Sequence, residues 1–231
     1  MKKIHKKKSV LPFLILTVLL VSVSVLIYRV LKIRQVDCYS QFGPCPEEIN
    51  QGLNHYVGTP LLKPLSGDVI KNDLKSFSQI KSASLYRRLP STLVVALSLR
   101  RPIGAIGSNV LGAQVIVDEE GFVFQKIPQS ALPTLITQDL PPVPSQLSAG
   151  QLRSLLSLEL VANLFDTQVS GILDKETLTI TTPNDLKVIV DIAQPTSNWY
   201  TPLQLIIHRS KINAKMPHKI DLRFTNSVIT Y

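Results

Sequence analysis

The side chains that could carry out chemistry are few and lie far apart along the chain. Histidines are common general bases and metal ligands, but the four present form no HxxxH or HExxH pattern, and there is no CxxC pair. We interpret these four as solvated or partly packed side chains: His5, His55, His208 and His218. No nucleophile is paired with a base. The sequence therefore predicts no catalytic residue, no metal site and no bound cofactor.

Three neighbouring carboxylates, residues 118–120, could act as an acid and base pair. They lie between two short apolar runs, residues 115–117 and 122–124, and are followed by Gly121. This pattern is typical of a β-hairpin with glycine in the turn, so we interpret Asp118, Glu119 and Glu120 as a solvated hairpin tip.

The two cysteines, Cys38 and Cys45, are separated by a segment that contains Gly43 and Pro44 and could turn the chain back. A disulfide between them would close a loop of about eight residues and stabilise the fold by about 2.5 kcal/mol in the chain-entropy model. The sequence favours this bridge. The alternative is that both are unrelated small buried side chains.

The net charge of +9 is concentrated at one end of the chain. Eight of the 25 basic residues lie in the first 34 positions, where there is no acidic residue: Lys2, Lys3, Lys6, Lys7, Lys8, Arg29, Lys32 and Arg34. The remainder is nearly neutral, so it has no excess of cations with which to bind the phosphates of DNA or RNA.

An uncharged run between Lys8 and Arg29 predicts a transmembrane helix, which we place at residues 9–31 after a cytoplasmic basic tail, residues 1–8. At about 1.5 Å per residue, twenty residues span about 30 Å of bilayer. The lysines of the tail favour a cytoplasmic N-terminus and an extracytoplasmic C-terminus in the inner membrane. A cleaved signal peptide is the alternative, but the run is too long for one and lacks a cleavage site.

The residues that follow predict an α+β fold in two parts. Residues 32–103 have the order strand, helix, helix, strand, strand, so two helices should cover one face of a three-stranded sheet: 33–38, 46–58, 67–77, 80–87 and 93–101. Residues 104–231 predict a mixed β-rich domain with two helices, 148–165 and 199–213, and two closing strands, 219–224 and 227–231. The last strand is apolar and uncharged. It could accept a partner's strand at a sheet edge or only complete its own sheet.

Six segments, in this order along the chain, resemble motifs of the FtsQ/DivIB family of bacterial cell-division proteins. They are residues 33–37, 58–62, 80–93, 100–104, 117–124 and 220–224. The resemblance covers the whole length. It implies a POTRA-like domain at 32–103 and a β domain at 104–231.

The resemblance also implies a function, that of a non-enzymatic scaffold at the division septum that helps to control wall synthesis. Its partners would be FtsB-like and FtsL-like proteins, together with the bilayer through residues 9–31, and neither nucleic acid nor a small-molecule substrate. The partner-binding positions that it implies are Arg223, Phe224, Ser227, Val228, Ile229, Thr230 and Tyr231.

The chain departs from the family pattern at three places. Arg100 stands where the family usually has Glu, Phe224 where it often has Tyr, and the segment from Cys38 to Cys45 replaces a short glycine turn. Two other functions remain open, a POTRA-type chaperone or assembly module of the envelope and a membrane-anchored envelope enzyme.

Overall fold

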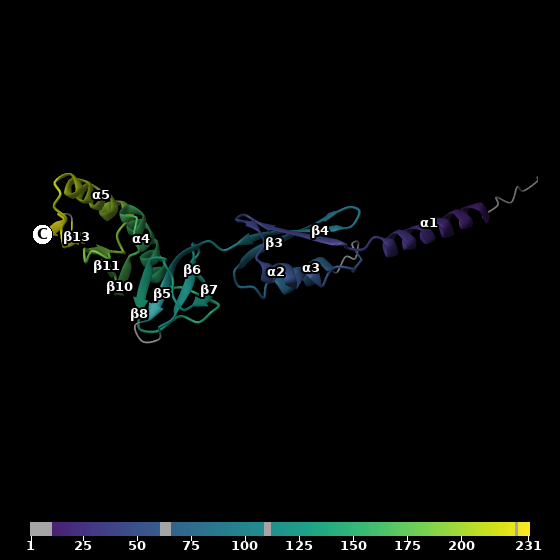
Figure 1. Ribbon diagram of the computed structural model, residues 1–231, viewed down its shortest axis with the longest axis horizontal. Helices are drawn as coiled ribbons and strands as arrows, with labels where there is room; N and C mark the ends of the chain where they lie inside the picture. Colours follow the sequence, from purple (N-terminus) through teal and green to yellow (C-terminus); the bar gives the residue numbers. More distant parts are fainter. Residues whose placement is uncertain (1–10, 61–65, 109–111, 225) are drawn as a thin grey trace, which may run out of the picture. The chain divides into compact units, whose positions relative to one another are not determined.

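The computed structural model describes residues 11–60, 66–108, 112–224 and 226–231 (Figure 1). The chain divides into two compact units, Met1–Leu99 and Arg100–Tyr231. Both combine helices with a β-sheet, so the fold is α+β.

The predicted transmembrane helix is wrong. Helix α1 spans Leu11–Val30, but in the described part of the chain no helix is both long and apolar enough to cross a membrane. The predicted single-pass localisation in the inner membrane, with residues 9–31 in the bilayer, is contradicted with it. The predicted basic tail, residues 1–8, lies outside the described residues.

The first unit contains a four-stranded sheet with the order β2-β1-β4-β3. The central strands β1 and β4 are parallel, and β3 and β4 form an antiparallel hairpin. The elements are β1 (Gln35–Ser40), β2 (Gly43–Pro44), α2 (Glu47–Asn54), α3 (Ser66–Leu74), β3 (Ile80–Arg88) and β4 (Thr92–Leu99).

Alternation along β4 produces the core of this unit. Leu93, Val95 and Leu97 are buried in one cluster with apolar side chains of α2 and α3, among them Ile49 and Leu74. Because successive strand residues point to opposite faces, the two helices cover the face of the sheet to which these three residues point (Figure 1).

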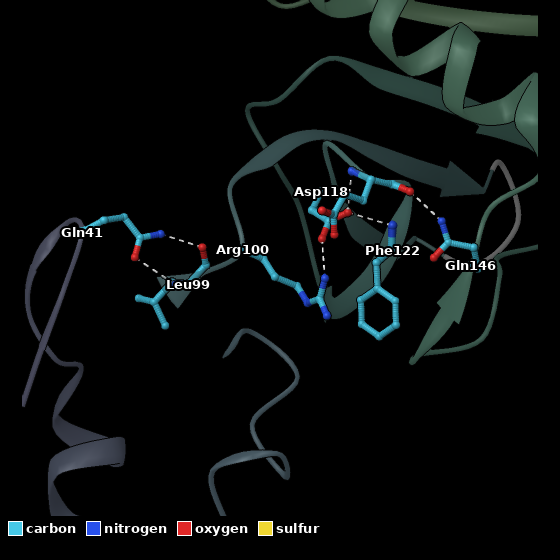
Figure 2. A network of polar contacts seen from close by, with 7 residues as sticks. Gln41, Leu99, Arg100, Asp118, Phe122 and Gln146 are labelled. Carbon is cyan, nitrogen blue, oxygen red and sulfur yellow. Dashed lines mark hydrogen bonds and ion pairs between the residues drawn. The ribbon is translucent and has the colours of Figure 1, made fainter. Parts of the chain in front are cut away.

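The β1–β2 hairpin of the first unit is held by a disulfide between Cys38 and Cys45, whose Cα atoms are 5.5 Å apart. The turn is also tied to the end of β4. The side-chain amide of Gln41 donates to the carbonyl oxygen of Leu99 at 2.6 Å and accepts from its N–H at 2.9 Å (Figure 2). A hairpin closed at both its base and its tip has few alternative conformations.

The second unit is built on a ten-stranded sheet with the order β14-β13-β12-β11-β10-β8-β5-β6-β7-β9. Its strands are β5 (Pro102–Ser108), β6 (Gln114–Asp118), β7 (Phe122–Ile127), β8 (Thr134–Thr137), β9 (Ser145–Gln146), β10 (Ser170–Asp174), β11 (Thr177–Thr181), β12 (Lys187–Asp191), β13 (Lys219–Asp221) and β14 (Val228–Thr230). Its helices are α4 (Ala149–Phe165) and α5 (Thr196–Ile212).

Both helices contribute fully buried side chains to one core with the sheet, including Leu155 and Leu158 from α4 and Trp199 and Leu203 from α5. Ser148 is the N-cap of α4, as its type and position predict, and its hydroxyl accepts from the N–H of Gln151 at 3.3 Å.

The interpretation of Asp118 as part of a solvated hairpin tip is wrong, since only 2% of its side chain is exposed. Its Oδ2 accepts from Nη1 of Arg100 at 2.6 Å, and its Oδ1 accepts from the N–H groups of Glu120 and Phe122 at 3.0 and 2.8 Å (Figure 2). The Arg100 guanidinium also lies 3.9 Å from the centre of the Phe122 ring. Arg100 therefore has a local role in this chain, which is to pair with a buried carboxylate.

Candidate strand-addition site

The outermost strand of the ten-stranded sheet, β14, pairs with β13 on one side only. In the register of this antiparallel pair, Lys219, Ile220 and Asp221 lie opposite Thr230, Ile229 and Val228 in turn. On its other side β14 has no neighbouring strand among the described residues. Such an edge can form backbone hydrogen bonds with a strand from another chain.

The side chains of β14 suit an apolar contact. Val228 and Tyr231 are 55% and 54% exposed, whereas Ile229 is half-buried on the side of the sheet core. The strand contains no charged residue and no proline, the two features that most often protect a sheet edge.

The opposite edge of the same sheet is built differently. It is formed by β9, only two residues long and directly preceded by Pro144, and Lys126 is exposed on the adjacent strand β7. A short strand, a proline and a lysine all discourage pairing with another chain. β14 is also short, with three residues, but it has no proline in or directly before it, and this difference favours β14 as the accepting edge.

An ion pair joins Asp221, the last residue of β13, to Arg223. Nε and Nη2 of Arg223 donate to the two carboxylate oxygens of Asp221 at 2.9 and 2.7 Å, and the N–H of Arg223 donates to Oδ1 at 3.2 Å. These hydrogen bonds lower the pKa of Asp221, and they raise the pKa of Arg223. Arg223 is one of the partner-binding positions that the resemblance implies, but its guanidinium is already bound to Asp221 within the chain.

An open pocket of about 610 Å³ lies beside the connection between β13 and β14, lined by Gln194, Asn198, Arg223, Phe224 and Asn226. Phe224 is 61% exposed, with the Arg223 guanidinium 5.3 Å from its ring centre. The pocket is closed on one side by Gln194, whose side-chain amide donates to the carbonyl oxygen of Arg223 at 3.0 Å. An aromatic side chain beside a hollow at the end of an edge strand provides an apolar anchor point next to the hydrogen-bonding edge.

The structure thus brings the predicted partner-binding residues together on one hairpin. Arg223 and Phe224 line the pocket, and residues 227–231 form and flank β14. Asp221 and Gln194 also belong to this site and were not predicted from the sequence. Asp221 was detectable, because residues two apart on a strand share a face and an acid at that spacing from Arg223 is a natural ion-pair partner.

Comparison with known proteins adds no further assignment, since no protein-family model and no curated protein matches the sequence.

Proposed function

We propose that this protein is a non-enzymatic scaffold of bacterial cell division that binds a partner by accepting one of its strands along β14. The observation that carries the proposal is that β14 is an uncharged edge strand beside an open pocket that Phe224 lines, while a proline precedes the strand at the other edge of the same sheet. Backbone hydrogen bonds would supply affinity, and Val228, Tyr231 and Phe224 would supply apolar contact.

The identity of the partners rests on the resemblance to the FtsQ/DivIB family. It makes FtsB-like and FtsL-like division proteins the first candidates to test. The order of elements in the first unit supports the POTRA-like part of that resemblance, with α2 and α3 between β1 and the β3–β4 hairpin.

The test is a binding titration between the full chain and segments of the FtsB-like and FtsL-like proteins from the same genome. We expect binding that is lost when residues 227–231 are deleted, with the circular dichroism spectrum unchanged. If the full chain binds neither segment, the proposed function is wrong.

A finer test uses two prolines, Val228→Pro and Ile229→Pro, made separately. Consecutive N–H groups of a strand point to opposite sides, so one of these changes removes a donor that faces β13 and the other removes a donor on the open edge. The variant that lacks only the donor on the open edge should keep its stability but no longer bind the partner. If that variant binds as the wild type does, strand addition along β14 is ruled out.

A further inference from the structure

Two lysines lie side by side on the sheet next to the accepting edge. In the parallel pair of β12 and β13, Lys187 is the register partner of Lys219, and Lys219 is the partner of Thr230 on β14. Thr181 of β11 lies at the other end of this row, opposite Lys187. The row therefore crosses four adjacent strands and stops at the open edge.

The lysine row lies on the face of the sheet that points away from the core. Val188 and Ile220, the next residues along β12 and β13, are fully buried, whereas Lys187, Lys219 and Thr230 are exposed. Because side chains alternate between the two faces of a strand, a strand added to β14 would place one side chain beside Thr230 as the next member of the row.

The two ammonium groups lack an ion pair within the described residues. Like charges on neighbouring strands repel each other, so this arrangement has a cost in the isolated chain. The Arg223 hydrogen bonds lower the pKa of Asp221 most and the charge of Lys219 adds to this lowering, but both carboxylate oxygens of Asp221 are held by Arg223. Asp185 lies in the exposed turn before β12.

The surrounding chain strengthens this positive charge. Residues 192–220 contain no acidic residue, and Lys215 lies in the loop before β13 with its Nζ 4.6 Å from the centre of the Tyr231 ring. A third ammonium group is therefore held at the end of β14 that is nearer to Thr230.

The spacing of the strands brings a partner's side chain within range. Adjacent strands are about 4.8 Å apart, so a position beside Thr230 lies about 10 Å from the backbone of Lys219. The flexible four-carbon stem of Lys219 can span most of this distance, and the side chain of Thr230 is small enough for the lysine to extend over it. Lys187 lies one strand further away, and its positive charge attracts the partner's side chain at longer range.

We propose that the strand accepted by β14 carries a carboxylate side chain beside Thr230, and that Lys219, supported by Lys187 and Lys215, recognises this carboxylate. The inference rests on the proposed strand addition and names the chemistry of the partner. It also explains how the register would be fixed. A shift of one residue would turn the carboxylate to the opposite face of the sheet, away from the lysines.

The experiment measures the affinity of the full chain for the fluorescently labelled FtsB-like segment. The variant is Lys187→Gln/Lys219→Gln, which removes a repulsion between exposed side chains and so should fold. The matched control, Lys126→Gln/Lys175→Gln, removes the same charge from exposed positions on β7 and in the β10–β11 turn. We expect about tenfold weaker binding for the variant at low salt, a difference that shrinks at high salt, and less than a twofold change for the control.

A charge exchange identifies the carboxylate. Each acidic residue of the segment is replaced in turn by lysine and tested against Lys187→Glu/Lys219→Glu, and one of these replacements should restore binding. Wild-type affinity in Lys187→Gln/Lys219→Gln would overturn the inference, and loss of binding on deletion of residues 227–231 would then still support strand addition. A full chain that binds no segment would overturn both.

Discussion

The buried ion pair between Arg100 and Asp118 should make a large contribution to the stability of the second unit. The side chains are 14% and 2% exposed, so replacing Arg100 with Met would leave a buried carboxylate with only two N–H donors, those of Glu120 and Phe122. Breaking a buried pair on one side costs about 3–5 kcal/mol, and the remaining hydrogen bonds place the expected cost of Arg100→Met at about 3 kcal/mol.

The complementary change, Asp118→Asn, keeps an oxygen that can accept the same two N–H groups but removes the negative charge of the group to which Nη1 of Arg100 donates. We expect it to cost about 2 kcal/mol. The double variant Arg100→Met/Asp118→Asn leaves no buried charge, so its cost should also be about 3 kcal/mol, which gives a coupling energy of about 2 kcal/mol.

Urea unfolding followed by tryptophan fluorescence is the appropriate assay. The chain has a single tryptophan, Trp199, which is buried in the second unit and therefore reports on the unit that contains the pair. Arg101→Met is the matched control, because this neighbouring side chain is 67% exposed and 4.0 Å from Glu159, and its loss should cost less than about 0.5 kcal/mol. Equal destabilisation by Arg100→Met and Arg101→Met, or additive single effects in the cycle, would refute the reasoning.

Two further predictions concern stability. Replacing both Cys38 and Cys45 by serine should lower the free energy of unfolding of the first unit by about 2.5 kcal/mol, because the bridge spans a sequence separation of 7. Differential scanning calorimetry of the oxidised chain and of the variant checks this, and equal melting temperatures of the first unit would contradict it. The Arg223 hydrogen bond lowers the pKa of Asp221 in the folded chain. The ionised Asp221 should therefore stabilise the fold fully above its ordinary pKa of about 4, and this stabilisation should be lost as the pH falls through the lowered pKa. Urea unfolding at pH 7 and pH 3 should show that the free energy of unfolding falls less on acidification in Asp221→Asn than in the wild type. Equal falls in the two proteins would contradict this role of Asp221.

Local patterns in the sequence predicted most elements of both units, because they depend on neighbouring residues. The capping serine of α4 is a signal of this kind. Strands with weaker patterns were missed, among them β5, where Gly104 and Gly107 interrupt the apolar residues, and the four-residue β8. Glycine has a low strand propensity, and only the neighbouring strands explain its presence there.

Contacts between distant residues account for what the sequence could not predict about the candidate site. Lys187 and Lys219 are far apart in the chain and become neighbours only because β12 and β13 pair in parallel. The position of β14 at the end of the sheet likewise depends on the order of all ten strands, so the sequence left open whether this strand is an edge. The partner-binding residues could be named from the resemblance, but the state of Arg223 required the structure.

The parallel pairing of β1 with β4 in the first unit has a consequence for the order of assembly. The register partners Gln35 and Thr92 are separated by most of the unit, whereas β3 and β4 are joined by a short turn. Closing the longer loop loses more chain entropy, so we expect the β3–β4 hairpin to form first and β1 to join it afterwards. During synthesis β1 leaves the ribosome well before its central neighbour exists. Until residue 99 has emerged, β1 must remain without its place in the sheet.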